Sequence, residues 1–222
     1  EVARDVVGLV RFLGLKQPII VGHSWGGNVA MQVAADYPDL ASGLICIDGG
    51  FIEPAAVPGA TWEQTEIRMA PPDFVALDFT WEQLVERAKT WETAPYWGDK
   101  MVDFLHANFV VQETGKVLPR LTRERHMKIL RSIWDQRVSE LYERISCPVL
   151  LIPALRSKLQ TQTGQTSEDW KMVSVTKATD HLLRNRVVWM EDSIHDVPIQ
   201  RPTDVARIII QASKEGFFDT YG

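Results

Sequence analysis

The feature that most constrains the fold of this chain is a glycine-rich turn with a serine at its centre. Residues 18–21 form a short apolar run rich in β-branched residues, which predicts a buried strand. The turn Gly-His-Ser-Trp-Gly-Gly follows at residues 22–27, and residues 28–35 are typical of a helix. A strand that leads through Gly22-x-Ser24-x-Gly26 into a helix holds the serine on a sharp, strained turn, with its hydroxyl clear of the sheet. The alternative is a glycine-rich turn in which Ser24 is incidental.

The rest of the chain alternates between strand-like and helical segments. Apolar runs at residues 43–47, 148–152 and 187–190 predict three further buried strands. A closing helix is predicted over residues 203–214. An opening amphipathic helix is predicted over residues 2–13, where apolar residues recur at helical spacing: Val2, Val6, Leu9, Val10 and Leu13. This order of elements predicts an α/β fold with a parallel sheet.

A long middle segment has a different character. Prolines cluster near its start, and helical patterns dominate at residues 80–91, 100–111 and 123–134, without strand alternation. We therefore predict three parts: residues 1–50 as the first part of the core, residues 51–145 as an inserted helical cap, and residues 146–222 as the second part of the core.

The hexapeptide GHSWGG at residues 22–27 resembles the nucleophile elbow of the α/β-hydrolase superfamily, in the form common among small esterases. The resemblance extends along the whole chain, through the next strand, the helical insertion and the last strand. It implies that Ser24 is the nucleophile of a serine hydrolase and that the backbone N–H of Trp25 helps to stabilise the oxyanion. It also implies that the strand before the elbow is the fifth of eight.

The start of the chain falls in the middle of the architecture that the resemblance implies. The sequence begins at Glu1 without a Met and without a signal peptide, and an upstream targeting signal stays open. We expect a fragment that lacks strands one to four and the loop that supplies the second oxyanion donor in the family. For the 222-residue chain alone we expect an exposed sheet edge at residues 18–21, low solubility and weak activity.

A serine becomes an effective nucleophile when a base within hydrogen-bond reach takes its proton. His195 follows the last predicted strand, where the resemblance places the histidine, and a surface-loop residue is the alternative. His181 is the rival, although a solvated or capping role in a helix explains it more simply. His23 is expected to point away from the hydroxyl. His106 and His126 belong to the insertion, on a helix surface or lining a pocket.

The acid that would complete a catalytic triad with Ser24 and His195 is the residue that the sequence constrains least. In most of the superfamily the acid follows the strand matched here by residues 149–152, yet the next six residues, 153–158, include no carboxylate. A second solution in the superfamily places the acid at the end of the strand after the elbow, which Asp48 occupies. Two alternatives for the acid stay open: Glu168 or Asp169 from the long loop takes this role, or the site has no effective acid. Asp196 is discounted because neighbouring side chains in extended backbone diverge.

Large aromatic residues are concentrated in the insertion. A cap rich in such residues would make an apolar, water-excluding pocket for an ester or lactone with a hydrophobic part, although ordinary packing explains any single one of them. The charged stretch at residues 120–128 is typical of a solvated helix face. The aromatic residues are Trp62, Phe74, Phe79, Trp81, Trp91, Trp97, Phe104, Phe109 and Trp134.

Composition excludes several other classes of protein. A net charge of -5 and a sequence pI near 5.6 provide no basic excess for nucleic acid, and no apolar run approaches the length of a membrane span. Cys46 and Cys147 lie in or beside apolar runs and are interpreted as buried free thiols, which favours the cytoplasm. Without metal-ligand spacing, a phosphate loop or a dinucleotide fingerprint, no cofactor is expected. The expected partner is a small molecule, and the oligomeric state stays open.

The leading functional hypothesis is a carboxylic-ester hydrolase that acts through an acyl-enzyme. A carbon–carbon bond hydrolase, an amino-terminal proline peptidase or a cofactor-free perhydrolase of the same fold would use the same triad, and the elbow cannot separate them. Ser24 in the place of an aspartate argues against haloalkane dehalogenases and epoxide hydrolases, which need a carboxylate nucleophile. A non-catalytic ligand receptor that keeps the pocket is the alternative from another class.

Overall fold

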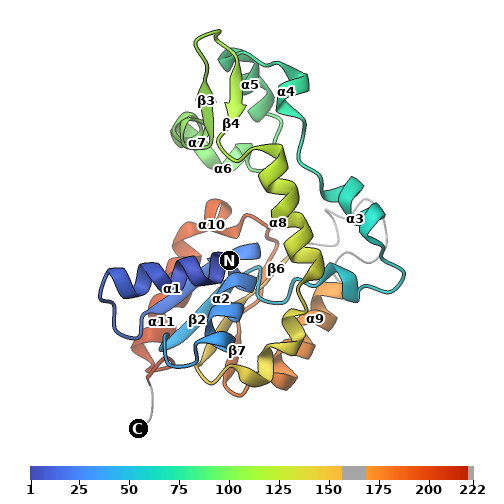
Figure 1. The fold of residues 1–222 in the computed structure, drawn as a ribbon. Coiled ribbons are helices and arrows are strands. Elements are labelled where there is room, and N and C mark those ends of the chain that lie inside the picture. The colour runs from blue at the N-terminus through green and yellow to red at the C-terminus, as the bar shows by residue number, and fades with distance from the viewer. Residues whose placement is uncertain (157–168, 220–222) are drawn as a thin grey trace. The chain divides into compact units, whose positions relative to one another are not determined.

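The computed structural model describes residues 1–156 and 169–219, and it divides into two compact units (Figure 1). The first unit is built from residues 1–53 and 136–222, and the second from residues 54–135. The elements of the first unit are α1 (Val2–Phe12), β1 (Ile19–His23), α2 (Trp25–Asp36), β2 (Gly43–Ile47), η3 (Val138–Glu140), η4 (Tyr142–Arg144), β5 (Val149–Ile152), β6 (Ala154–Leu155), α9 (Asp169–His181), β7 (Asn185–Val187), β8 (Met190–Glu191), α10 (Val197–Gln200) and α11 (Pro202–Lys214).

The first unit is organised around a four-stranded sheet in the order β1-β2-β5-β7, in which every neighbouring pair is parallel. The register pairs His23 of β1 with Ile47 of β2, so the next residues, Ser24 and Asp48, leave adjacent strands at the same edge. Beyond the sheet, β6 and β8 form a short parallel pair that leads toward His195. The parallel sheet with its helices confirms the predicted α/β fold class.

The two faces of the sheet are buried by different helices, as the alternation of side chains along a strand requires. On one face, Leu44 and Cys46 of β2 join an apolar cluster with α2, η3, η4 and α9. On the other face, Ile45 and Ile47 of the same strand join a cluster with α10, α11 and the residues just after α11. β2 is therefore buried at all five positions, which fixes the strand that ends at Asp48 inside the core.

The strand β1 and the helix α1 are more exposed than the centre of the sheet. Within the described residues β1 pairs with β2 alone, and Val21 is 52% exposed. α1 packs against α2 and buries Val7 and Val10, whereas Phe12 is 87% exposed. The predicted helix is therefore present, but its buried face does not include Leu9 and Leu13, which are both exposed.

The second unit has a small core of its own around α5, α7 and a hairpin. Its elements are η1 (Pro54–Ala56), α3 (Trp62–Met69), α4 (Phe74–Leu77), α5 (Trp81–Ala88), α6 (Ala94–Trp97), η2 (Gly98–Lys100), α7 (Met101–Asn108), β3 (Phe109–Val111), β4 (Val117–Pro119) and α8 (Arg123–Asp135). The core residues Leu84, Leu105 and Val117 are fully buried or nearly so. Thr80 forms a capping box with Gln83 at the start of α5, which satisfies backbone donors at that helix end.

The structure corrects three expectations about the elements. The insertion contains the antiparallel pair β3–β4, whose three-residue strands are too short to show alternation, and the helix predicted to reach residue 111 ends at Asn108. The single strand predicted over residues 187–190 is divided between β7 and β8. Residues 136–145 belong to the first unit rather than to the insertion, because Tyr142 and its neighbours pack into the sheet cluster.

Candidate functional site

Ser24 lies on the turn between β1 and α2, in the strained conformation that its position in the motif predicts. Its φ and ψ are 54° and -125°, a region that side-chain-bearing residues rarely adopt and that costs roughly 1–3 kcal/mol. The turn is anchored to the sheet because the Ser24 amide donates to the carbonyl of Ile47 at 2.9 Å. Ser24 is also the N-cap of α2, so the next residue, Trp25, begins the helix with its backbone N–H at the helix N-terminus.

Two closely packed glycines shape this turn, but only one of them, Gly22, belongs to the Gly-x-Ser-x-Gly motif. A Cβ at Gly22 would lie 2.2 Å from the carbonyl oxygen of Gly26, and a Cβ at Gly27 would lie 2.6 Å from the amide of Gly50. A Cβ at Gly26 itself would meet nothing within 4 Å. The steric requirement therefore falls on Gly22 and Gly27 rather than on the second glycine of the motif.

Asp48 terminates β2 next to the serine turn and is almost completely buried, with 1% of its side chain exposed. Its Oδ2 lies 2.6 Å from Nδ1 of His195, and its Oδ1 accepts from the amide of Ala154 at 3.0 Å. The ammonium of Lys171 donates to Oδ1 at 2.8 Å and to Oδ2 at 3.0 Å. Burial alone would raise the pKa of Asp48, but the contacts from His195, Lys171 and the Ala154 amide outweigh it and lower that pKa below its ordinary value. Asp48 is therefore held as a carboxylate.

His195 lies between Ser24 and Asp48 and contacts both. Its Nε2 is 2.8 Å from the Ser24 hydroxyl and its Nδ1 is 2.6 Å from Asp48. A carboxylate can only accept hydrogen bonds, so Nδ1 of His195 must donate to Asp48. The neutral ring that satisfies both contacts therefore carries its proton on Nδ1 and accepts from the Ser24 hydroxyl at Nε2. The loop is held in place by His23, whose Nε2 donates to the carbonyl of His195 at 2.9 Å, and by the Ile194 amide, which donates to Gln200 at 2.8 Å.

A family model described as the alpha/beta hydrolase fold matches residues 1–213. The chain belongs to this family. Because the match covers almost the whole of this α/β-hydrolase, it includes the serine turn, the Asp48 strand and the His195 loop together.

Two curated relatives and one solved structure illustrate the similarity. A putative esterase/lipase from Haemophilus influenzae is 46% identical over 46 residues, which are 21% of this chain and 16% of that protein. A serine hydrolase-like protein from Danio rerio is 28% identical over 170 residues, which are 72% of this chain and 50% of the relative. The crystal structure of E-2-(acetamidomethylene)succinate hydrolase has a TM-score of 0.67 at 20% identity, over 96% of this chain and 72% of the other. The matches to both curated relatives thus span half of their length or less.

The remaining histidines and acids that the sequence singled out lie on other elements or outside the described residues. His181 ends α9, where its Nδ1 is 3.2 Å from Glu143, and it does not replace His195. His106 stacks on Trp81 within the second unit, with ring centroids 4.1 Å apart. His126 lies on α8 and Asp196 precedes α10. Glu168 and the side chain of Asp169, the alternative acids, lie outside the described residues.

Asn28 contributes to the site in a way that the sequence reading missed. It is fully buried on α2, and its Oδ1 accepts from the amides of Gly50 at 3.0 Å and Ile52 at 3.3 Å. Its Nδ2 donates to the carbonyl of Ile52 at 2.6 Å. These bonds fix the segment that follows Asp48. A polar residue among the apolar positions of the helix after the elbow was the available signal, because buried polar groups need partners.

Lys171 is the second residue that the sequence reading missed, and no motif points to it. It lies on α9, 123 positions from Asp48 in the sequence, and reaches the carboxylate through the fold alone.

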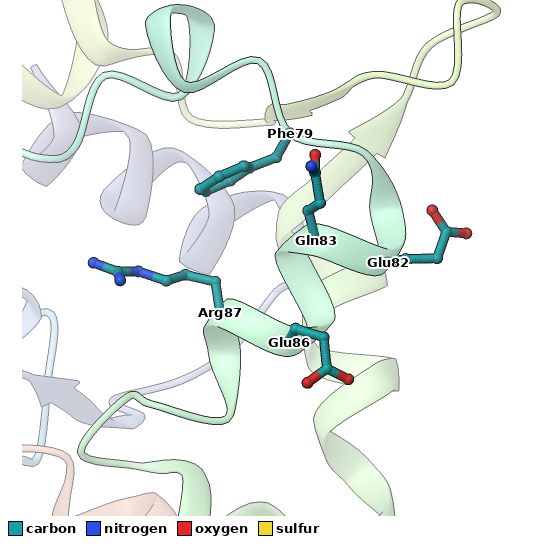
Figure 2. Close-up of a pocket in the computed structure, with 5 residues that line it drawn as sticks. All are labelled: Phe79, Glu82, Gln83, Glu86 and Arg87. Atoms are coloured by element: carbon teal, nitrogen blue, oxygen red, sulfur yellow. The ribbon is translucent and has the colours of Figure 1, made fainter.

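Neither the two cysteines nor one pocket of the second unit has the features of the Ser24 site. Cys46 and Cys147 are free and buried, and burial raises the pKa of the Cys147 thiol to about 11, so it is protonated at neutral pH. Figure 2 shows residues that line a pocket of the second unit, with the side chains of Phe79 and Arg87 extending to the same side. Its lining residues include no serine, cysteine or histidine; they are Phe79, Glu82, Gln83, Glu86 and Arg87.

The described part of the chain holds no group of three or more histidine, cysteine, aspartate or glutamate residues that could bind a metal ion. In the same residues, no helix combines the length and the apolar composition that crossing a bilayer requires.

Proposed function

We propose that this chain is a serine hydrolase that cleaves a carboxylic ester or lactone through an acyl-enzyme intermediate. The observation that carries the proposal is the continuous hydrogen-bonded chain of three side chains, with 2.8 Å between Ser24 and His195 and 2.6 Å between His195 and Asp48. A nucleophile, a base and an orienting acid in this order are the arrangement that activates a serine for acyl transfer.

The roles follow from what each atom can do. The Ser24 oxygen attacks the substrate carbonyl while Nε2 of His195 takes its proton, and Asp48 stabilises the imidazolium that forms. The backbone N–H of Trp25, at the start of α2, is proposed to donate to the oxyanion. The imidazolium then protonates the leaving alcohol. In the second half-reaction, His195 activates a water that releases the acyl group from Ser24.

The choice of an ester or lactone rests on the serine nucleophile. A serine nucleophile forms an acyl-enzyme with a carbonyl substrate, and an alcohol leaves from the tetrahedral intermediate more easily than an amine does. One relative is described as a putative esterase/lipase, but the matched segment is 16% of its length, so the substrate class is carried by the site and not by the similarity. The prediction that residues 51–145 cap the site stays a prediction.

A burst assay with p-nitrophenyl acetate tests the proposal. An acyl-enzyme predicts a rapid release of nitrophenol, up to one equivalent per chain, followed by slower steady turnover. Ser24→Ala should abolish both phases. His181→Ala is the matched control, because His181 contacts Glu143 and not Ser24, and it should leave both phases unchanged.

Two outcomes would argue against the proposal. Saturable binding of the ester without nitrophenol release would favour a ligand receptor of the same fold. Turnover that persists in Ser24→Ala would place the nucleophile elsewhere.

A further inference from the structure

The carboxylate of Asp48 has two cationic or potentially cationic partners rather than one. On one side is the imidazole of His195, which becomes a cation when it takes the serine proton. On the other side is the ammonium of Lys171, which contacts both carboxylate oxygens and also donates to the carbonyl of Ala154 at 2.8 Å. The Lys171 side chain is 15% exposed, so its charge lies largely within the protein.

We propose that Lys171 is a positioning residue of this site: it fixes the orientation of Asp48, and its positive charge offsets the negative charge of the carboxylate beside His195. The inference rests on the proposed function, because it assigns a role to a residue behind the proposed base. Lys171 touches no reacting atom and acts through Asp48 alone.

The geometric part of the proposal follows from where the three Lys171 contacts lie. Asp48 ends β2, and Ala154 begins β6 just beyond the neighbouring strand β5. The ammonium therefore joins the ends of two adjacent strands, and the Ala154 amide also donates to Oδ1. With Oδ1 held in this way, Oδ2 is fixed toward Nδ1 of His195. The rotation of the carboxylate is thus set by contacts that do not involve the histidine.

The electrostatic part follows from the charge of the group around the imidazole. Asp48 and Lys171 together are neutral, so protonation of His195 places a second cation beside one carboxylate. Within the described residues, the titratable neighbours of His195 include His23, whose ring centroid is 4.9 Å away, and Asp196, which follows it in the chain. Removing the lysine charge leaves a net negative group beside the ring. Imidazolium is then favoured over the neutral ring.

The rate of Ser24 phosphonylation by a fluorophosphonate, measured against pH, tests this inference. The reaction needs neutral His195, so its rate rises with pH as the base loses its proton. Lys171→Met should move the midpoint of this rise upward by about one pH unit and lower the plateau about 10-fold. Lys171→Arg keeps the charge and should leave the midpoint in place.

Lys177→Met is the matched control, since Lys177 lies on the same helix and contacts Ser139 rather than Asp48. Its profile should superimpose on that of the unmodified chain. Should Lys171→Met fail to fold by circular dichroism, Lys171→Gln makes the same test, because it is also uncharged and retains hydrogen-bond donors.

The possible results separate this inference from the proposed function. A lower plateau with an unchanged midpoint in the neutral variants would show that Lys171 is only structural and would overturn the inference. If the unmodified chain is not phosphonylated at Ser24 at any pH, the proposed function fails first. A midpoint that rises in Lys171→Met, but not in Lys171→Arg or Lys177→Met, supports both.

Discussion

Asp48 and His195 share a hydrogen bond of 2.6 Å but lie in very different surroundings. The Asp48 side chain is 1% exposed, at the end of a strand buried at every position, and its oxygens are held by Lys171 and the Ala154 amide. His195 is 44% exposed, on a loop held mainly through its backbone. Asp48, the proposed acid, is therefore part of the core, whereas His195, the proposed base, is partly exposed. Replacing the acid should affect both folding and chemistry, and replacing the base should affect chemistry almost alone.

The largest effect on activity is expected for the exposed partner. His195→Ala removes the proposed base, and loss of such a group costs on the order of 10⁶ in kcat. Because Asp48 keeps its contacts with Lys171 and Ala154, the free energy of unfolding should fall by about 1 kcal/mol or less. Ester turnover and urea denaturation measure the two quantities. A loss of several kcal/mol would contradict the view that the base lies outside the core.

The buried partner should show the opposite balance. Asp48→Asn leaves the geometry nearly unchanged but disfavours the required tautomer of His195, which costs about 10⁴ in kcat. It also removes the negative charge opposite Lys171 and should lower the free energy of unfolding by about 1–3 kcal/mol. The same two assays apply. A larger loss of unfolding free energy in His195→Ala than in Asp48→Asn would show that this difference between the two residues is wrong.

Gly49, next to Asp48, and Gly26, two residues after Ser24, differ in how closely their surroundings are packed. A Cβ at Gly49 would lie 2.1 Å from the carbonyl oxygen of Ser24, so Gly49→Ala should destabilise the chain by about 1–3 kcal/mol and slow Ser24 labelling. Gly26→Ala is the matched control, because a Cβ there meets nothing within 4 Å and alanine favours a helix. Urea denaturation and fluorophosphonate labelling of both variants decide the point. Equal losses would mean that the turn is not packed as described.

The smallest effect concerns pH. The folded-state pKa of Asp48 is lowered, so its carboxylate adds stability above the ordinary aspartate pKa of about 3.9, and this stability is lost as the pH falls through the lower folded value. The difference in free energy of unfolding between the unmodified chain and Asp48→Asn should therefore be constant above about pH 5 and shrink below about pH 4. Urea titrations from pH 3 to pH 7 measure it. A difference that grows toward acid would mean that the pKa of Asp48 is raised.

Local sequence patterns were enough to predict the elements around Ser24. The strand, the strained turn and the helix around Ser24 are consecutive, so their residue types alone predicted them. Asp48 was a candidate because residues 153–158 include no carboxylate, but its distance from Ser24 depends on the register between β1 and β2, which no single segment reveals. Lys171 could not be found, since its contact with Asp48 joins residues far apart in the chain. The hairpin β3–β4 was missed because its strands have three residues each.

We propose above all that Ser24 is an activated nucleophile. The most direct test is to treat the chain with a fluorophosphonate and to locate the adduct by peptide mass spectrometry. We expect one adduct per chain, on the peptide that contains Ser24. Labelling should be absent in Ser24→Ala and strongly reduced in His195→Ala. An adduct on another residue, or labelling that persists in Ser24→Ala, would contradict it.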